Sequence, residues 1–195
     1  NASIFKEIVT SSVGADTLAQ FIIGEQVQYR ITLVLPEGTS PGLIVRDSIP
    51  AGMRLVQRSA TQIGASITGC TDTPTPAVPT DGALTATWTF TGSCVAAIGA
   101  SVADRTITFE YITQVQNLSS VNQGSALNNT VQFEINSVNS TPITVNSTVL
   151  EPVVSAVTKT VSPSTNFDAG DLLTYEVTLS NTGNATAYDL SLIHI

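Results

Sequence analysis

Three polar residues occupy positions at which strand alternation turns side chains inward: Lys6, Asp47 and Asn129. Each shares a face of its predicted strand with apolar side chains two or four residues away, namely Ile4, Ile8, Val45, Ile49, Val131 and Phe133. Three inward polar groups need one another as partners, because a polar group buried alone is costly. Burial lowers the pKa of a lysine and raises that of an aspartate. The expected result is a neutral amine that can act as a nucleophile and a carboxylic acid that can donate a proton.

The two cysteines of the chain, Cys70 and Cys94, flank a polar segment rich in proline and threonine. A pair is too few for a zinc site, so the alternatives are a disulfide and two buried free thiols. We favour the disulfide, which would close a loop of about 25 residues and stabilise the fold by about 3 kcal/mol. It would also indicate an exported protein. We expect residues 70–82 (CTDTPTPAVPTDG) to form a loop, because prolines do not pair in the interior of a sheet.

The elements that must position these residues are strands. Hydrophobic alternation of period two recurs along most of the chain, whereas the period of an amphipathic helix is hard to find. Residues 24–33 (GEQVQYRITL) have an apolar face of Val27, Tyr29, Ile31 and Leu33. Similar runs, separated by Gly, Pro, Asn or Ser, are SIFKEIV, GLIVRDSIP, MRLVQRSA, LTATWTFTG, RTITFEYITQV and NNTVQFEI. We therefore predict an all-β protein with an Ig-like antiparallel β-sandwich.

An internal repeat divides the chain. Residues 170–179 (GDLLTYEVTL) nearly repeat residues 24–33, and a lysine precedes each copy, the second being Lys159. A repeat of this kind predicts two units of similar structure. We expect a complete β-sandwich over residues 1–150 and the truncated beginning of a second β-sandwich repeat over residues 151–195.

The composition argues against several classes of function. A net charge of −8 with only 7 Lys and Arg side chains disfavours a nucleic-acid partner. No apolar run approaches the roughly 20 residues that cross a bilayer, so we expect no membrane insertion in this segment. We do not expect an enzyme, because the chain has no GxSxG turn, and its histidine, His194, falls in residues 190–195, which we interpret as a non-native tail. We expect neither metal nor cofactor, because four loop carboxylates lack the spacing of a calcium loop: Asp72, Asp81, Asp168 and Asp171.

Four motifs follow one another within residues 3–135: IFKEIV, GEQVQYRITLVLPEGT, IVRDSIPAGMRLV and LNNTVQF. Together they resemble the isopeptide-forming domains, of the D2 type, of fimbrial and other surface proteins. That family has a lysine on its first strand, a G(D/E)xVxYxI strand, a DxxPxG corner and a closing NTA-like strand. The second unit, with GDLLTYEVTLSNTGNATAYD, resembles a related repeat module found in tandem in large bacterial and archaeal surface proteins.

The resemblance implies a covalent isopeptide bond between Lys6 and Asn129, promoted by Asp47 as the acid. A neutral amine beside a polarised amide carbon can attack it and expel ammonia. The chain departs from the family pattern at NNTV, where alanine commonly follows the threonine, and Asn128 competes as the acceptor. Asn129 is favoured as the acceptor because strand alternation places it on the same face as Val131 and Phe133, which Asn128 does not share. Glu25 is the alternative to Asp47 as the acid. A simpler reading is that Lys6 reaches solvent, Asp47 caps a turn and Asn129 bonds the backbone.

Two functions fit these observations. The one we prefer is a structural segment of a bacterial or archaeal cell-surface stalk, fimbria or adhesin, whose partners are neighbouring repeats of the same chain. There a crosslink would resist extension and proteolysis. The alternative is an adhesin module that recognises host or matrix polymers through its loops, with residues 70–82 as the contact. Both place the protein outside the cell, at the cell surface.

Overall fold

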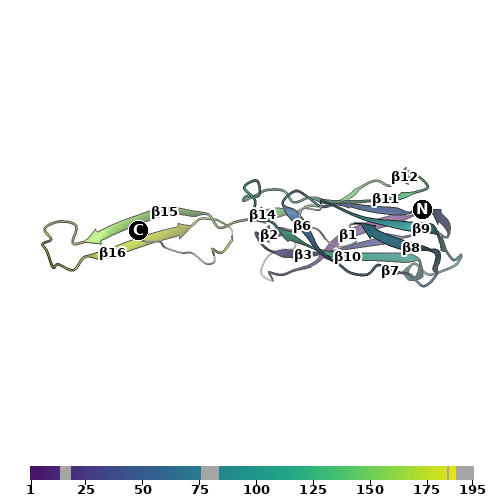
Figure 1. Cartoon of the computed structure of the whole chain (residues 1–195), viewed down its shortest axis with the longest axis horizontal. Coiled ribbons are helices and arrows are strands. Elements are labelled where there is room, and N and C mark those ends of the chain that lie inside the picture. The colour runs from purple at the N-terminus through teal and green to yellow at the C-terminus, as the bar shows by residue number, and fades with distance from the viewer. Residues whose placement is uncertain (14–18, 76–83, 184, 188–195) are drawn as a thin grey trace. The chain divides into compact units, whose positions relative to one another are not determined.

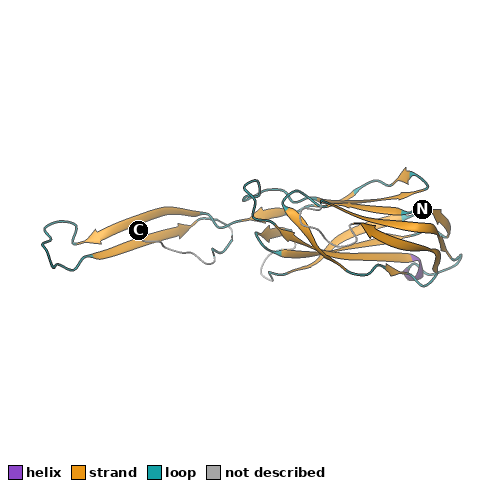
Figure 2. Ribbon diagram, in the orientation of Figure 1, coloured by secondary structure: helices purple, strands orange, loops and turns teal. Residues whose placement is uncertain are grey.

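The computed structural model describes residues 1–13, 19–75, 84–183 and 185–187. The chain divides into two compact units, Asn1–Val149 (unit 1) and Leu150–Ile195 (unit 2). Strands dominate both, and one 3-10 turn, η1 (Ala103–Arg105), is the helical element within the described ranges (Figure 2). The predicted all-β fold class, an Ig-like antiparallel sandwich, is confirmed by the topology of unit 1.

The first sheet of unit 1 has the order β1-β3-β10-β6, with β7 also paired to β10. Its strands are β1 (Ser3–Ser11), β3 (Gln26–Val34), β6 (Met53–Arg58), β7 (Gln62–Ile63) and β10 (Thr106–Val115). All these pairings are antiparallel. Every second residue of β3 is fully buried, as the alternation predicts: Val27, Tyr29, Ile31 and Leu33.

The second sheet of unit 1 has the order β12-β11-β5-β9-β4, with β13 beside β11 and β8 beside β9. Its strands are β4 (Gly38–Pro41), β5 (Ile44–Ser48), β8 (Ile67–Thr75), β9 (Thr85–Ala96), β11 (Asn129–Ile135), β12 (Val138–Asn139) and β13 (Ile143–Val145). Two short strands, β2 (Gln20–Ile22) and β14 (Thr148–Leu150), form a separate pair.

The apolar faces of the two sheets meet in one core. Trp88 on β9 contacts Phe109 and Tyr111 on β10, with ring centroids 4.9 and 6.0 Å apart. All three side chains are almost completely buried. Figure 1 shows the layers of unit 1, with β11 and β12 along one side and β3, β10 and β7 along the other.

The chain crosses from the second sheet to the first at the corner between β5 and β6. The Met53 N–H donates to the Pro50 carbonyl over 3.0 Å, and Gly52 has a φ of +98°. Glycine suits this turn because the backbone must enter the left-handed region. The corner places Asp47 near the end of β5, just before the chain leaves the second sheet.

The prediction of a loop over residues 70–82 is wrong for residues 70–75. Residues up to Thr75 belong to β8, and Pro74 lies opposite Trp88 in the pairing with β9. The proline is tolerated because β8 is an edge strand, whose outer backbone groups need no partner. Residues 76–82 lie outside the described ranges. The predicted disulfide is present, and Cys70–Cys94 joins β8 to β9 across a separation of 24 residues.

Unit 2 contains one antiparallel pair, β15 (Val154–Ser162) and β16 (Thr174–Asn181), in the part that the structure describes. Several large apolar side chains of the unit are exposed: Val154, Val157, Phe167, Leu172, Tyr175 and Leu179. The interpretation of this pair as the beginning of a second sandwich stays a prediction. The predicted tail, 190–195, with His194, lies outside the described residues.

Candidate functional site: a buried amine, acid and carboxamide

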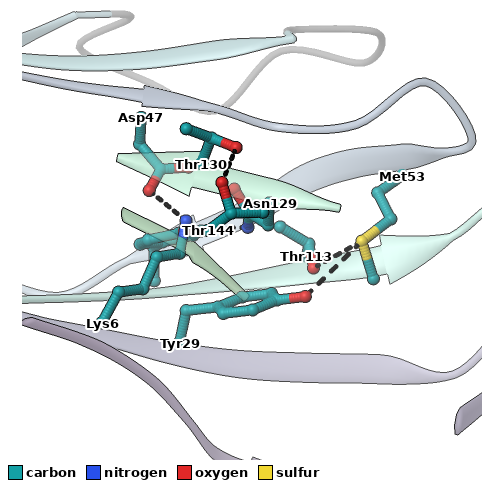
Figure 3. Close-up of polar contacts among 9 residues, drawn as sticks. Lys6, Tyr29, Asp47, Met53, Thr113, Asn129, Thr130 and Thr144 are labelled. Atoms are coloured by element: carbon teal, nitrogen blue, oxygen red, sulfur yellow. Dashed lines mark hydrogen bonds and ion pairs between the residues drawn. The ribbon is translucent and has the colours of Figure 1, made fainter. Parts of the chain in front are cut away.

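Lys6 is the buried residue of β1. Its side chain is fully buried, while the neighbouring Phe5, on the other face of the strand, is 56% exposed. The inward direction predicted for Lys6 is therefore confirmed, and the lysine does not reach solvent. Its Nζ donates a hydrogen bond to Asp47 Oδ2 across the space between the two sheets (Figure 3).

Asp47 lies on β5, in the second sheet, and is fully buried between two apolar residues of its face, Val45 and Ile49. One carboxylate oxygen, Oδ2, accepts the hydrogen bond from Lys6. The other, Oδ1, has no hydrogen-bond partner among the described residues. The carboxyl thus contacts the amine through one of its two oxygens.

Asn129 begins β11, the strand next to β5. Val131 lies opposite Asp47, so Asn129, two residues earlier, shares the face of Asp47 on the adjacent strand. The residue is fully buried, whereas Asn128 is exposed, which confirms the parity argument for direction. Its Nδ2 donates to Tyr111 Oη over 2.9 Å, and its Oδ1 has no partner among the described residues.

Two tyrosines form the floor of the site. The Lys6 Nζ lies 5.1 Å from the centroid of the Tyr29 ring and 5.7 Å from that of Tyr111. The rings are stacked, with centroids 5.5 Å apart, because the two residues are directly paired on β3 and β10. The structure therefore joins Lys6, Asp47 and Asn129 in one cluster, in which Tyr111 links the carboxamide to the amine.

Burial sets the protonation of the cluster. It lowers the pKa of Lys6 from 10.5 to about 8, although Asp47 opposes the shift. Burial also raises the pKa of Asp47, against the opposing effects of Lys6, Tyr111 and Arg58. Both shifts favour uncharged forms, a neutral amine and a carboxylic acid. These are the forms that attack of an amine on a carboxamide requires.

The lowered pKa of Lys6 predicts an unusual pH dependence of stability in an Asn129→Ala variant, which retains the pair but has no acceptor. Between pH 8 and 10 the unfolded chain binds more protons at Lys6 than the folded chain does, so the free energy of unfolding should rise. The full shift corresponds to about 3 kcal/mol. Above pH 10 it should fall, because the buried Tyr29 and Tyr111 have raised pKa values.

Denaturant titrations of the Asn129→Ala variant at several pH values measure this effect. The matched control adds Lys6→Met, which keeps an unbranched side chain of similar length and removes the titrating amine. The rise between pH 8 and 10 should disappear in the control. An equal rise in both proteins would show that another group causes it.

The alternative acid, Glu25, has a different place in the fold. It is 1% exposed, and its Oε2 accepts the Ile22 N–H over 2.8 Å in the turn between β2 and β3. The carboxylate that contacts Lys6 is that of Asp47. The geometry therefore favours Asp47 as the acid.

Unit 2 repeats the arrangement of the lysine and the first tyrosine. In unit 1, Lys6 lies opposite Ile31, two residues after Tyr29. In unit 2, Lys159 lies opposite Val177, two residues after Tyr175, and its Nζ is 4.7 Å from the Tyr175 ring centroid. The sequence repeat is thus also a repeat of strand register. No acid or asparagine is assigned to Lys159.

Two of the carboxylates considered for calcium accept local hydrogen bonds. Asp72, which lies in β8 rather than in a loop, accepts from the Thr61 hydroxyl, and Asp171 accepts the N–H of Asp168. No group of three or more metal-binding side chains occurs in the described residues. Asp81 lies outside them. Within the same residues, no helix is long and apolar enough to span a membrane.

The sequence matches no protein-family model and no curated protein. Among solved structures it is similar to the N-terminal domain of the Streptococcus gordonii adhesin Sgo0707, with 15% identity and a TM-score of 0.48 over 75% of this chain and 32% of that one. It is also similar to the T6 backbone pilin of Streptococcus pyogenes (14% identity, TM-score 0.48, 78% and 37% covered). A third is BcpA, the major pilin subunit of Bacillus cereus (14%, 0.46, 94% and 56%). The chain spans about a third of the first two structures' length.

Proposed function

We propose that unit 1 crosslinks itself by an amide bond between Lys6 Nζ and Asn129 Cγ, with Asp47 as the promoting acid. The chain would then be a structural segment of an extracellular pilus, stalk or adhesin protein. The observation that carries the proposal is the buried contact of Lys6 with Asp47, on the face that also holds Asn129. Stability alone is a poor reason for this cluster, because a buried ion pair often stabilises a fold less than apolar side chains of the same volume.

The reaction starts from the neutral amine and the carboxylic acid. The Lys6 Nζ lone pair attacks Cγ of Asn129 while the acid of Asp47 polarises the carboxamide. The Nζ–Cγ bond forms, the Cγ–Nδ2 bond breaks, and its electron pair leaves with Nδ2. One proton passes overall from Nζ to Nδ2, which departs as ammonia. Asp47 ends the reaction as it began, so the residue acts as a catalyst of a single intramolecular event.

The position of the bond suits a load-bearing protein. It would join β1, the first strand of unit 1, to β11, close to the end of the unit. Tension applied through the two ends would then pass through the amide bond rather than through the strands between them. The Cys70–Cys94 disulfide supports export, since disulfides persist in oxidising compartments. The repeated lysine register of unit 2 supports neighbouring repeats as the partners.

Recognition of host or matrix polymers through residues 70–82 stays a second prediction. The first six of those residues are edge strand, and the others lie outside the described ranges. No observation on the described residues favours it over the structural function.

Mass spectrometry tests the crosslink, and the chain supplies its own control because Lys6 and Lys159 are its only lysines. The reduced wild-type protein should be lighter than its sequence by one ammonia. An amine-acylating reagent applied to the denatured protein should modify Lys159 and leave Lys6 unmodified, because the Lys6 nitrogen is then an amide. A full sequence mass together with acylation of both lysines would refute the crosslink.

A further inference from the structure

The nitrogen that must leave Asn129 is held by a residue that the reaction above does not use. Asn129 Nδ2 donates its hydrogen bond to Tyr111 Oη at 2.9 Å, whereas the hydrogen bond of Lys6 goes to Asp47. The leaving nitrogen thus contacts Tyr111, whereas the attacking nitrogen contacts Asp47. Tyr111 is buried to 1% exposure and lies in the middle of β10, with Trp88 and Tyr29 against its ring, so its hydroxyl has little freedom to move.

We propose that Tyr111 is a catalytic residue of the crosslinking reaction, which delivers the proton that converts the Asn129 amide nitrogen into ammonia. This inference rests on the proposed function. The phenol suits the task because its oxygen both accepts and donates, so it can hold the amide N–H first and protonate the same nitrogen later.

The proton transfer follows from the change at Nδ2. In the planar amide the nitrogen lone pair is delocalised, and the nitrogen can only donate, as it does to Tyr111. After Lys6 attacks Cγ, the carbon becomes tetrahedral and the lone pair of Nδ2 becomes available. The Tyr111 O–H then gives its proton to Nδ2 as the Cγ–Nδ2 bond breaks.

The phenol must regain a proton, and Asp47 can supply it. The two groups are close enough that each affects the pKa of the other, in part through a side-chain hydrogen bond. Asp47 replaces its own proton from the Lys6 nitrogen, which loses one on becoming an amide. Tyr111 and Asp47 are both restored, and one proton has moved from Nζ to Nδ2.

The neighbouring Tyr29 provides a matched comparison. It lies directly opposite Tyr111 in the sheet, its ring is stacked on that of Tyr111, and it also lies beneath Lys6. Its hydroxyl, however, donates to Met53 Sδ at 3.8 Å (Figure 3). The Asn129 side chain also affects the pKa of Tyr29, so Tyr29→Phe tests a second phenol near the same amide. It leaves the hydrogen bond from Asn129 Nδ2 to Tyr111 Oη in place.

The test follows crosslinking over time by intact mass in freshly synthesised, unreacted chains of wild type, Tyr111→Phe and Tyr29→Phe, made by cell-free translation. We expect Tyr111→Phe to react at least about tenfold more slowly, as is typical when a positioned acid or base is lost, and Tyr29→Phe to be slowed clearly less than Tyr111→Phe. Near-ultraviolet circular dichroism verifies that each variant folds. A Tyr111→Phe protein that reacts at the wild-type rate, or two variants slowed equally, would overturn the role of Tyr111.

A second measurement covers the case in which Tyr111→Phe does not fold. Fluorotyrosine placed at position 111 keeps the hydroxyl and increases its acidity, so the rate should change more at position 111 than with the same substitution at position 29. A constant rate at position 111 would overturn the proposal. A wild-type protein that never loses ammonia would instead refute the crosslink itself, so the two failures are distinguishable.

Discussion

An Asp47→Asn protein should fold as unit 1 does and remain uncrosslinked, with a mass heavier by one ammonia than the crosslinked form. The side chain keeps its shape, and its amide oxygen can still accept a hydrogen bond from a neutral Lys6 amine. It has no acidic proton to give. Loss of a positioned acid typically slows a reaction about 10²- to 10⁴-fold, so the bond should be undetectable within hours of folding. Intact mass and lysine acylation measure the result.

The control is Glu25→Gln, which makes the same change at a buried carboxyl in the turn between β2 and β3. Its amide oxygen can still accept the Ile22 N–H that Glu25 Oε2 accepts, so the turn should persist. This variant should crosslink like wild type. A bond that forms in Asp47→Asn and is lost in Glu25→Gln would assign the acid to Glu25 instead.

The inward direction of the cluster follows from the sequence because it depends on strand parity alone. Lys6, Asp47 and Asn129 share their faces with apolar residues, and that alternation is visible without any knowledge of pairing. Asn129 is chosen over Asn128 by the same argument. Burial of all three then follows once two sheets exist to cover both faces.

The contribution of Tyr111 could not be predicted in this way. Alternation within RTITFEYITQV shows that the ring points inward, but not that its hydroxyl meets Asn129. That contact depends on the register of β10 with β3 and on the distance between the two sheets, which are tertiary properties. One signal in the sequence could have suggested a role for Tyr111: a second tyrosine, Tyr29, occupies an inward position of the β3 segment.

The error at β8 has a similar cause. Proline excludes a strand only where both sides of the strand must pair, and the position of a strand in its sheet is not a local property. Pro74 lies on an edge strand, which pairs on one side only, so a residue without an N–H is compatible with the sheet. Local patterns therefore identified the longer strands other than β8, with their inward faces, whereas the order of strands within each sheet decided where a proline could be accommodated.

The largest effect of the crosslink should appear when it is removed by Asn129→Ala. A bond between residues 6 and 129 closes a loop of about 120 residues, which stabilises the folded state by about 5 kcal/mol in the chain-entropy estimate. For a unit of this size the midpoint of thermal unfolding should fall by on the order of 10–20 °C. If the midpoint falls further than this, part of the additional destabilisation would come from the buried Tyr111 hydroxyl, which loses its hydrogen-bond partner Asn129. The Asp47→Asn protein, which keeps the carboxamide, separates the two contributions.

Single-molecule extension distinguishes the crosslink from a merely stabilising cluster. When wild-type unit 1 is pulled from its ends, about 120 residues lie between the crosslinked positions and cannot extend, which removes roughly 400 Å from the contour length. The Cys70–Cys94 disulfide lies inside that span, so its reduction should not change the wild-type length. In Asn129→Ala the missing length should appear, and reduction should then add the loop closed by the disulfide. A wild-type protein that extends over its whole length would show that Lys6, Asp47 and Asn129 are hydrogen-bonded but unreacted, because hydrogen bonds would not survive unfolding of the strands that carry them.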